Sequence, residues 1–180
     1  MGEDKIVQFV SFETTLNTEQ FVMQWEQYNR SVNSDADVTL QQSENKDAFK
    51  YIAQHRCAAG ELQFVFTRAK KTSRMPEVEI KAKQAGGYLV VQTERLNDAH
   101  PDESKIFVFL SNASVSPETL RHLPNHGKLN IYEAYYENCQ YAFILEFFVK
   151  NKHLSPLIEQ LKLHAVHDFG VYKECVLQAS

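Results

Sequence analysis

The sequence predicts an α+β fold of two tandem ferredoxin-like repeats, with antiparallel sheets and helices on the outer face of each sheet. Each half of the 180-residue chain reads strand, helix, strand, strand, helix, strand, which is the element order of a ferredoxin-like unit. An acidic, turn-rich break at residues 94–104 separates the two halves. An internal repeat of this kind indicates a fold before it indicates a function. We therefore expect repeat 1 at residues 1–95 and repeat 2 at residues 104–180.

The first repeat begins with a strand at residues 5–13, which is rich in β-branched and aromatic residues. Asn17 then offers a helix cap, with Gln20 three residues later as in a capping box. Apolar residues follow at helical spacing from Phe21 onward. Strands at residues 38–42 and 49–56 flank a hairpin turn. We then expect a helix at residues 58–70, a helical turn from Pro76 to residue 84 that Gly86 and Gly87 end, and a closing strand at residues 88–93.

The second repeat begins with a strand at residues 105–111. Ser116 and Pro117 provide the cap and first turn of a short helix that Pro124 ends. Strands at residues 129–137 and 140–150 form a predicted hairpin, a helix begins near Ser155, and the last strand covers residues 170–177. The aromatic content of the hairpin strands indicates burial on both faces, one against helices and one against another sheet.

The composition argues against several classes of function. The formal net charge is −4 and no long basic run is present, so we expect no nucleic-acid partner. No apolar run is long enough to span a bilayer, and the N-terminus lacks a signal-peptide pattern, so we expect no membrane partner and a cytoplasmic location. The three cysteines are widely spaced and fit neither a disulfide framework nor a metal clip.

Pairs of late histidines suggest a metal site only weakly. His164 and His167 are three residues apart, which suits ligands on one helix face, but the helix is expected to end between them. His122 and His126 have Pro124 between them. No carboxylate or cysteine accompanies either pair at ligand spacing, so we expect no metal.

Four segments of the first half carry a resemblance to a known family. They are the opening strand at residues 7–12, the helix signature Phe-Val-Met-Gln-Trp-Glu-Gln-Tyr at 21–28, the strand Phe-Lys-Tyr-Ile-Ala-Gln-His at 49–55, and Gly-Tyr-Leu-Val-Val at 87–91. In this order they resemble the antibiotic biosynthesis monooxygenase family of dimeric α/β-barrel proteins. The second half matches only as another copy of the same strand-helix order.

The resemblance implies a sheet that closes a barrel with a second sheet, and no cofactor. Members of the family oxidise aromatic polyketides without metal or flavin, and related barrels bind and degrade haem. The haem-degrading branch uses an asparagine on the first strand with a histidine and a tryptophan beyond. Here the first strand has Gln8 instead, and the only tryptophan, Trp25, lies in the predicted helix. The resemblance therefore does not favour haem cleavage.

Two residues of the third strand are the candidate catalytic pair. His55 shares strand parity with Tyr51 and Ala53, so all three face one way. If that face lines the barrel, His55 is a candidate proton carrier with Tyr51 as its partner. The alternative is a strand-end histidine near solvent. In the family, a tryptophan and an acidic residue stand near the positions of His55 and Arg56, and we assign Arg56 to substrate binding.

The second half supplies two further candidates for substrate binding. Glu146 lies between apolar neighbours of its strand, where a carboxylate can act as a base. It can equally form a salt bridge or lie at an open barrel mouth. Tyr135 is the other candidate, on the strand face that it shares with Ile131 and Glu133.

Three functions remain open at this point. The first is a cofactor-independent monooxygenase acting on a small aromatic or polyketide-like molecule in the barrel. The second is a non-catalytic binding module for a small ligand or haem, and the third is a structural or stress-related barrel without a pocket. We expect a homodimer because exposed sheet faces of this composition would associate. The barrel could close within one chain or between two.

Overall fold

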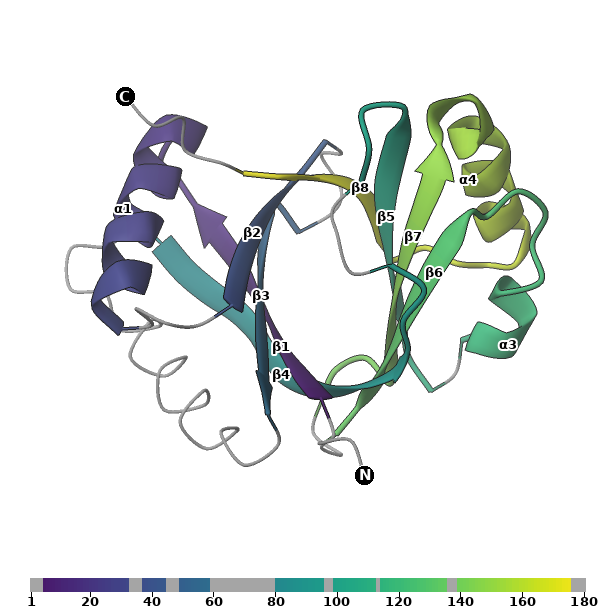
Figure 1. Ribbon diagram of the computed structural model, residues 1–180, viewed down its shortest axis with the longest axis horizontal. Helices are drawn as coiled ribbons and strands as arrows, with labels where there is room; N and C mark the ends of the chain where they lie inside the picture. The colour runs from purple at the N-terminus through teal and green to yellow at the C-terminus, as the bar shows by residue number, and fades with distance from the viewer. Residues whose placement is uncertain are drawn as a thin grey trace.

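The computed structural model shows eight strands that form one closed barrel (Figure 1). It describes residues 5–32, 37–44, 49–58, 80–95, 99–112, 114–135 and 139–175. The strands of the first half are β1 (Lys5–Thr14), β2 (Asp37–Ser43), β3 (Tyr51–Ala58) and β4 (Ile80–Gln92). Those of the second half are β5 (Glu103–Leu110), β6 (Lys128–Ala134), β7 (Phe143–Lys150) and β8 (Phe169–Glu174).

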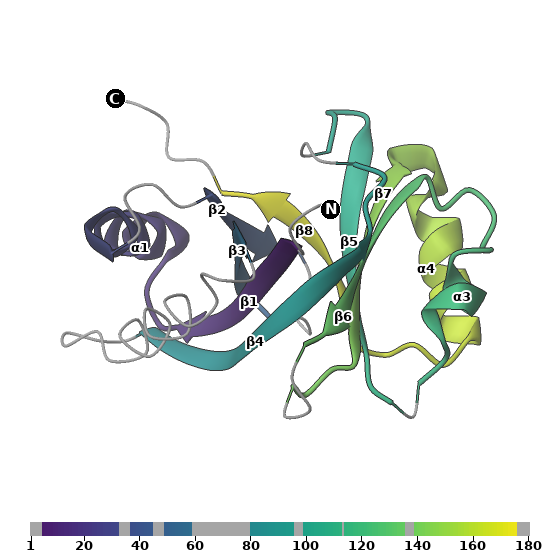
Figure 2. The same cartoon turned by 60° about the horizontal axis from the view of Figure 1, so that its bottom comes forward.

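The helices lie outside the barrel on two opposite sides. Helix α1 (Thr18–Val32) flanks the strands of the first half, and α3 (Pro117–Leu120) and α4 (Leu154–Leu163) flank those of the second (Figures 1 and 2). A short 3-10 turn at Asn151–His153 leads into α4. The predicted outer placement of the helices is therefore confirmed for the helices that the structure describes.

The two halves have the same strand order, read in the same direction around the barrel. The order is β1-β3-β2-β8-β5-β7-β6-β4, and every neighbouring pair is antiparallel. In each half the third strand pairs with the first and second, and the fourth strand pairs with the first. The helix expected at residues 58–70 lies almost wholly outside the described residues, so the ferredoxin-like identity of both repeats stays a prediction.

The barrel closes within a single chain. Strand β2 pairs with β8, and β4 pairs with β6, so the two halves of the chain join at both edges. This resolves the alternative that the sequence left open. The homodimer was expected because exposed sheet faces would associate, and in this structure the second half of the same chain covers those faces. Dimerisation stays a prediction that needs another cause.

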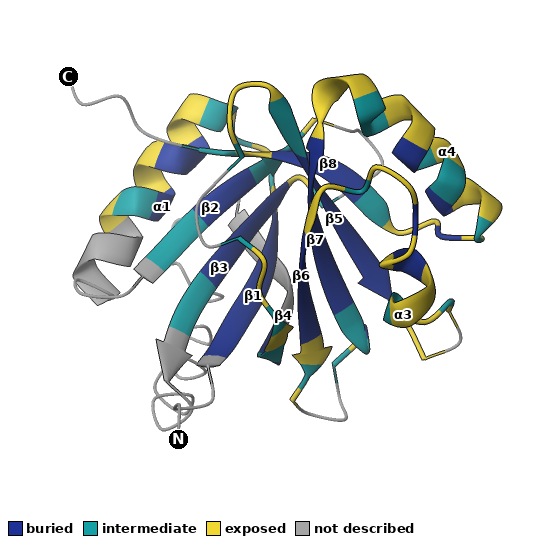
Figure 3. Ribbon diagram, turned by 45° about the vertical axis from the view of Figure 1, so that its right-hand side comes forward, coloured by how far each residue is buried: buried dark blue, intermediate teal, exposed yellow. Residues whose placement is uncertain are grey.

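Strand alternation divides the buried side chains into an interior and two outer layers. One outer cluster packs under α1 and includes Phe12, Phe21 and Trp25. The other packs under α3 and α4 and includes Phe147 and Leu157. A third cluster lies inside the barrel and consists of Val7, Phe9, Ile52, Tyr88, Phe107, Phe109, Tyr132, Tyr141, Ile144 and Tyr172. Consecutive residues along the middle of the strands are buried (Figure 3), so both faces of these strands are covered. Trp25 is a core residue rather than a substrate wall.

Local signals at two helix starts are confirmed. The Asn17 side chain accepts a hydrogen bond from the Gln20 backbone at 2.9 Å, and the Gln20 side chain accepts one from the Asn17 backbone at 3.3 Å, which is the reciprocal pattern of a capping box. Ser116 caps α3, with Pro117 in its first turn. Helix α4 begins at Leu154, one residue before the predicted start.

The predicted helical turn ending at residue 84 is wrong, because β4 already begins at Ile80. Gly86 and Gly87 do not stop a helix; they lie inside β4 and pair with Phe9 and Gln8 of β1. A Cβ at Gly86 would lie 3.0 Å from the Tyr88 ring and 3.2 Å from the Cys139 sulfur. Because Gly86 has no side chain, the Tyr88 ring and the Cys139 sulfur can pack close to the backbone of β4.

The predicted hairpin of the second half is also looser than expected. Strand β6 ends at Ala134 and β7 begins at Phe143, so residues 135 and 139–142 of the connection are not strand. The tight turn predicted at residues 138–139 lies partly outside the described residues and stays a prediction.

Gly127 provides a test of the packing between β6 and β7. Its φ is +70°, and a Cβ there would lie 1.9 Å from the Phe148 carbonyl oxygen. We expect Gly127→Ala to lower the free energy of unfolding by more than about 2 kcal/mol, because both the backbone and the contact oppose it. Exposed Lys128 is the neighbouring control, and Lys128→Ala should change stability by no more than about 0.5 kcal/mol. Urea denaturation of both variants measures the difference, and equal effects would contradict this packing.

Candidate functional site

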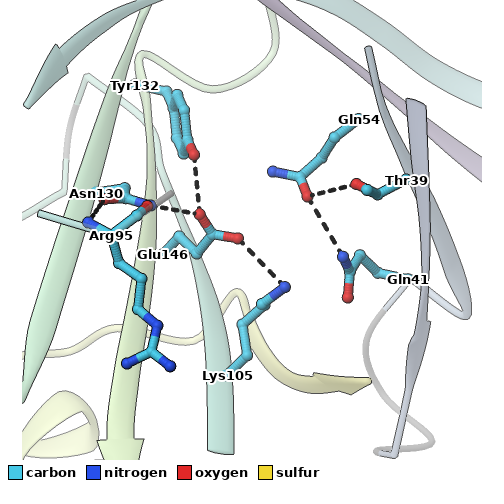
Figure 4. A network of polar contacts seen from close by, with 8 residues as sticks. All are labelled: Thr39, Gln41, Gln54, Arg95, Lys105, Asn130, Tyr132 and Glu146. Atoms are coloured by element: carbon cyan, nitrogen blue, oxygen red, sulfur yellow. Dashed lines mark hydrogen bonds and ion pairs between the residues drawn. The ribbon is translucent and has the colours of Figure 1, made fainter. Parts of the chain in front are cut away.

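Glu146 of β7 is the centre of a polar network inside the barrel. Its side chain is 1% exposed. One carboxylate oxygen accepts hydrogen bonds from the Asn130 amide at 2.9 Å and from the Tyr132 hydroxyl at 2.8 Å. The other oxygen lies 3.6 Å from the ammonium of Lys105, which is 3% exposed (Figure 4). An anion and a cation are thus held together away from water.

The strand register places these four side chains on one wall. Asn130 of β6 lies directly opposite Glu146, and Tyr132 is two residues further along the same face of β6. Lys105 begins the buried part of β5 and pairs with Phe148, two residues from Glu146. The Lys105 ammonium also lies 5.4 Å from the centroid of the Phe148 ring, where the negative face of the ring attracts a cation.

Asn130 joins this wall to the segment that connects the two halves. Its side-chain oxygen accepts hydrogen bonds from the backbone amides of Glu94 and Arg95 at 2.9 and 3.1 Å, and its nitrogen donates to the Arg95 carbonyl at 2.8 Å. Arg95 forms a 2.8 Å ion pair with Glu103 at the start of β5. Every polar atom of the Asn130 side chain therefore has a partner, and the connection is fixed to the network.

The opposite wall carries uncharged polar side chains from β2 and β3. The oxygen of Gln54 accepts weak hydrogen bonds from the Thr39 hydroxyl at 3.3 Å and from the Gln41 amide at 3.5 Å. Gln41 and Gln54 are each 1% exposed. In Figure 4 the free nitrogen of Gln54 points toward the wall that carries Tyr132 and Glu146. The two polar groups thus face each other across the interior.

Three buried atoms of this second wall have no hydrogen-bond partner among the described residues. They are Nε2 of Gln54, Oε1 of Gln41 and the hydroxyl of Ser11. Ser11 and Gln41 lie on either side of Ile52, since both pair with it across neighbouring strands. Gln8 also has an unpartnered nitrogen, but it lies on the other face of β1. The three interior atoms are the unusual feature, because nearly all buried polar atoms in proteins are bonded.

Aromatic rings occupy the centre of the interior beside the polar walls. Phe9 makes edge-on contacts with Tyr88, Phe107 and Tyr132, at centroid distances of 5.5, 6.0 and 5.0 Å. Phe9 is also the direct neighbour of Gln54 across β1 and β3. The polar atoms of Gln54 therefore lie next to an apolar, ring-lined surface.

The surroundings of the interior tyrosines raise their pKa values. Burial raises the pKa of Tyr132 well above its ordinary value, and the neighbouring Glu146 carboxylate raises it further, while the positive charge of Arg56 partly opposes both. Burial also raises the pKa of Tyr88 and of Tyr172. Their hydroxyls donate to the carbonyls of Tyr141 and Phe49. All three are therefore neutral hydrogen-bond donors at ordinary pH.

The structure does not place the predicted catalytic pair in the interior. Tyr51 stacks on Phe21 of α1 with a centroid distance of 4.1 Å, and its hydroxyl donates to Thr18 at 2.9 Å. Ala53 belongs to the same outer cluster, and His55 shares their strand face and is half-buried. The prediction required the strand face of Tyr51, Ala53 and His55 to line the barrel, and this requirement is wrong because that face lies outside it. The interior face of β3 carries Ile52, Gln54 and Arg56 instead, and no observation tests a role of His55 and Tyr51 elsewhere.

The three residues predicted to bind substrate are separated. Glu146 lies in the interior and forms a salt bridge, which was one of the alternatives for it. Arg56 lies on the interior face of β3, and its charge acts on Tyr132 across the barrel. Tyr135 follows the end of β6 and is 46% exposed, away from both. Glu146 and Arg56 therefore both face the interior and both act on Tyr132, whereas Tyr135 lies outside.

Several interior residues were missed by the sequence analysis. They are Ser11, Thr39, Gln41, Gln54, Lys105, Asn130 and Tyr132. The usable signal was the alternation of polar with apolar residues in strand β2, where Thr39 and Gln41 flank Leu40. Such alternation ordinarily indicates a solvent-facing side, whereas here it marks the inside of a closed barrel.

The described interior does not fit haem held by a histidine. All seven histidines are among the described residues, and none lies on the interior face of a strand. Haem iron also accepts a tyrosine ligand, but Tyr88, Tyr132 and Tyr172 already donate to protein acceptors.

Neither a metal cluster nor a membrane helix is found in the part of the chain that the structure describes. There, no three histidine, cysteine, aspartate or glutamate side chains converge as a metal site would require. No helix in these residues is long and apolar enough to cross a membrane.

Comparison with solved structures shows that the chain has the fold of the chlorite dismutases. An arginine-to-alanine mutant of chlorite dismutase from Candidatus Nitrospira defluvii matches with a TM-score of 0.64 and 9% identity, over 98% of this chain and 93% of that chain. A double mutant of the same dismutase, with a tryptophan changed to tyrosine and an arginine changed to glutamine, matches with a TM-score of 0.62 and 9% identity. The match covers 98% of this chain and 93% of that chain. The complex of that dismutase with imidazole matches with a TM-score of 0.58 and 10% identity, over 96% of this chain and 92% of that chain.

These likenesses extend over nearly the whole chain and agree with the expected α/β barrel of antiparallel strands. At such low identity they show the fold alone. No protein-family model matches the chain, and no curated protein matches it either. The monooxygenase family itself therefore has no support beyond the resemblance of the first half.

The ion pair of Lys105 and Glu146 can be tested by a mutant cycle. We expect Lys105→Met to lower the free energy of unfolding by about 3–5 kcal/mol, because it leaves a buried carboxylate without its cation. The same change in a Glu146→Gln background should cost much less, since no buried charge is then unpaired. Urea denaturation of the four proteins measures the coupling. The exposed pair of Arg121 and Glu118 is the control, and Arg121→Met should leave stability unchanged. Additive effects at Lys105 and Glu146 would contradict the interior pairing.

The buried tyrosines predict how stability changes at high pH. Their pKa values in the folded protein lie above the ordinary value of 10.0. Unfolded tyrosines therefore lose their protons first, and stability is fully present below pH 10 and falls as the pH rises above it. Denaturation across this range, with tyrosinate absorbance recorded in parallel, measures the slope. Tyr132→Phe should make the slope shallower, whereas an unchanged slope in that variant would place Tyr132 outside the buried network.

Proposed function

We propose that the barrel interior binds a small molecule between its two polar walls. One wall is the charged network of Lys105, Asn130, Tyr132 and Glu146, and the other is the amide and hydroxyl group of β1, β2 and β3. The observation that carries the proposal is the set of buried atoms on Gln41, Gln54 and Ser11 that have no partner among the described residues. A ligand with complementary groups would supply those partners.

Energetics support a binding role over a purely structural one. An unpartnered buried polar atom costs about 1–3 kcal/mol, so we expect each of these three atoms to bond to a ligand or to ordered water. A domain has only about 5–15 kcal/mol of net stability. A barrel selected for stability alone would place apolar side chains at Gln41 and Gln54, as it does at the neighbouring Ile52.

The buried ion pair supports the same conclusion. Apolar residues of similar volume often stabilise a protein as well as a buried ion pair does, or better. Lys105 and Glu146 are almost completely buried, and they have hydrogen-bonded neighbours that hold them in one geometry. Such preorganised charges are typical of sites that recognise or transform a ligand.

The monooxygenase hypothesis is a narrower form of this proposal. Cofactor-free oxygenation requires donors that stabilise a substrate anion in a dry site. Lys105 and Asn130 are donors of this kind, and Glu146 is the available base. In this form the catalytic groups belong to the charged wall and not to His55 and Tyr51. Each half would then be one ferredoxin-like repeat, at residues 1–95 and 104–180, contributing one wall to the site.

Isoleucine methyl groups can report on binding by NMR. Ile52 and Ile144 belong to the interior cluster, whereas Ile106 and Ile131 belong to the core under α3 and α4. We expect a library of small planar aromatic and aliphatic fragments to contain members that shift the methyl signals of Ile52 and Ile144 selectively. Haemin, added as a separate probe, should give no absorbance spectrum of ligated haem.

Matched variants define the site in this experiment. Glu146→Gln keeps the shape and one acceptor oxygen but removes the charge, and it should alter the affinity of the fragments that bind. Glu133→Gln changes an exposed carboxylate on β6 and should have no effect. If no fragment shifts the interior methyl signals, the binding proposal fails and the barrel is structural. If haemin added to the protein gave the absorbance spectrum of ligated haem iron, the expectation that the protein does not bind haem would be contradicted.

A further inference from the structure

We infer that Lys105 forms an imine with a small aldehyde or ketone, with Glu146 as its proton acceptor and Gln54 as the donor to the carbonyl oxygen. This inference rests on the proposed function and names the ligand class of the interior site, a carbonyl compound. It follows from the surroundings of the lysine, from the carboxylate beside it and from the direction of the free amide nitrogen on the opposite wall.

Lys105 is a primary amine held inside a ring-lined barrel. Its side chain is 3% exposed, and its nitrogen lies 5.4 Å from the centroid of the Phe148 ring and 5.9 Å from that of the Phe107 ring. The lysine amine is the side-chain nucleophile that condenses with carbonyl groups, and lysines that do so typically lie among apolar groups away from water. The position of Lys105 is therefore that of an imine-forming lysine.

Glu146 supplies the proton acceptor that an ammonium group needs before its nitrogen can attack. Oε2 of Glu146 lies 3.6 Å from Nζ of Lys105, whereas Oε1 accepts hydrogen bonds from Asn130 and Tyr132. Those two bonds fix the carboxylate and direct its other oxygen toward the lysine. An iminium carries the same positive charge as the ammonium that it replaces, so the reaction leaves no buried charge unpaired.

Gln54 provides a hydrogen-bond donor on the opposite wall. Its oxygen is bonded to Thr39 and Gln41, and its nitrogen has no partner among the described residues although the side chain is buried. In Figure 4 the Gln54 nitrogen points toward the charged wall, and the Lys105 ammonium points toward the amide wall. A carbonyl group between them would meet the amine at its carbon and the amide at its oxygen, which polarises the carbonyl for attack.

The condensation balances with the groups on these two walls. Glu146 takes a proton from the Lys105 ammonium, and the nitrogen lone pair forms a bond to the carbonyl carbon while the C=O π pair moves to the oxygen beside Gln54. Glu146 then gives that proton to the oxygen and takes another from the nitrogen, which yields a neutral carbinolamine. Finally, Glu146 protonates the hydroxyl, the C–O bond breaks, water leaves and the nitrogen lone pair forms the C=N bond. The products are the iminium, one water and the original carboxylate.

Reductive trapping with acetaldehyde and sodium cyanoborohydride at neutral pH tests the inference. Hydride transfer from the borohydride to the iminium carbon gives N-ethyl-lysine, and peptide mass spectrometry at early times measures a separate rate for each lysine. Lys128 and Lys150, which are exposed, are the internal references. We expect Lys105 to be ethylated at least about tenfold faster than either, because an adjacent proton carrier contributes about 10²–10⁴-fold, which outweighs slower access.

Three variants test the assigned roles. Glu146→Gln keeps the size of the side chain but cannot carry the proton, and it should slow ethylation of Lys105 by about 100-fold. Gln54→Leu removes the donor to the carbonyl oxygen and should slow it by at least about tenfold. Gln24→Leu, at an exposed glutamine of α1, is the control and should leave the rate unchanged. If Glu146→Gln does not fold, Gln54→Leu carries the same test. A rate at Lys105 that neither interior variant lowers would contradict both roles.

The outcomes separate this inference from the proposed function. Fast ethylation of Lys105 that depends on Glu146 and Gln54 supports imine formation. Ethylation slower than at the exposed lysines is the behaviour of a buried structural lysine, and it overturns the inference. If Lys105 is not labelled while fragments still shift the Ile52 and Ile144 methyl signals, the carbonyl class is overturned and an interior binding site remains. If no fragment shifts those signals either, the proposed function fails as well.

Discussion

Closure of the sheet within one chain is the constraint on which the rest of the structure depends. Once β2 pairs with β8 and β4 with β6, every strand has an outer side and an interior side, and solvent is excluded from the second. Each polar group on the interior side must then find a partner inside the barrel. The charged wall meets this requirement through Glu146. The amide wall does not, and this difference between the walls is why we interpret the interior as a site.

The charged wall also connects the interior to the junction of the two halves. Asn130 uses its nitrogen for both Glu146 and the Arg95 carbonyl, and its oxygen for the amides of Glu94 and Arg95. The connection between β4 and β5 is therefore held by the same side chain that positions the buried carboxylate. A change in the interior network would be felt at this connection, because the two share hydrogen bonds rather than only packing contacts.

The sequence predicted the elements and the antiparallel barrel well, and it predicted the site poorly. Strands and helix starts follow from local chemistry, as the caps at Asn17 and Ser116 show. The β4 error arose because residues 76–84 have a proline and few β-branched residues, whereas pairing with β1 decides the conformation of Ile80 onward. The site depended on which face of β3 is inside. Alternation shows that Tyr51 and Gln54 face opposite ways, but only the position of α1 shows that Tyr51 faces outward. The ordinary rule that polar residues face solvent fails in a closed barrel.

A high-resolution crystal structure of the protein, with the interior examined for electron density beside Gln41 and Gln54, tests the interpretation most directly. We predict density for a bound molecule or ordered water within hydrogen-bond distance of the Gln54 nitrogen and the Gln41 oxygen, facing the intact pair of Lys105 and Glu146. An interior in which both glutamines bond only to protein atoms, with aromatic side chains packed against them and no further density, would contradict it. In that case the barrel is a structural unit without an interior site.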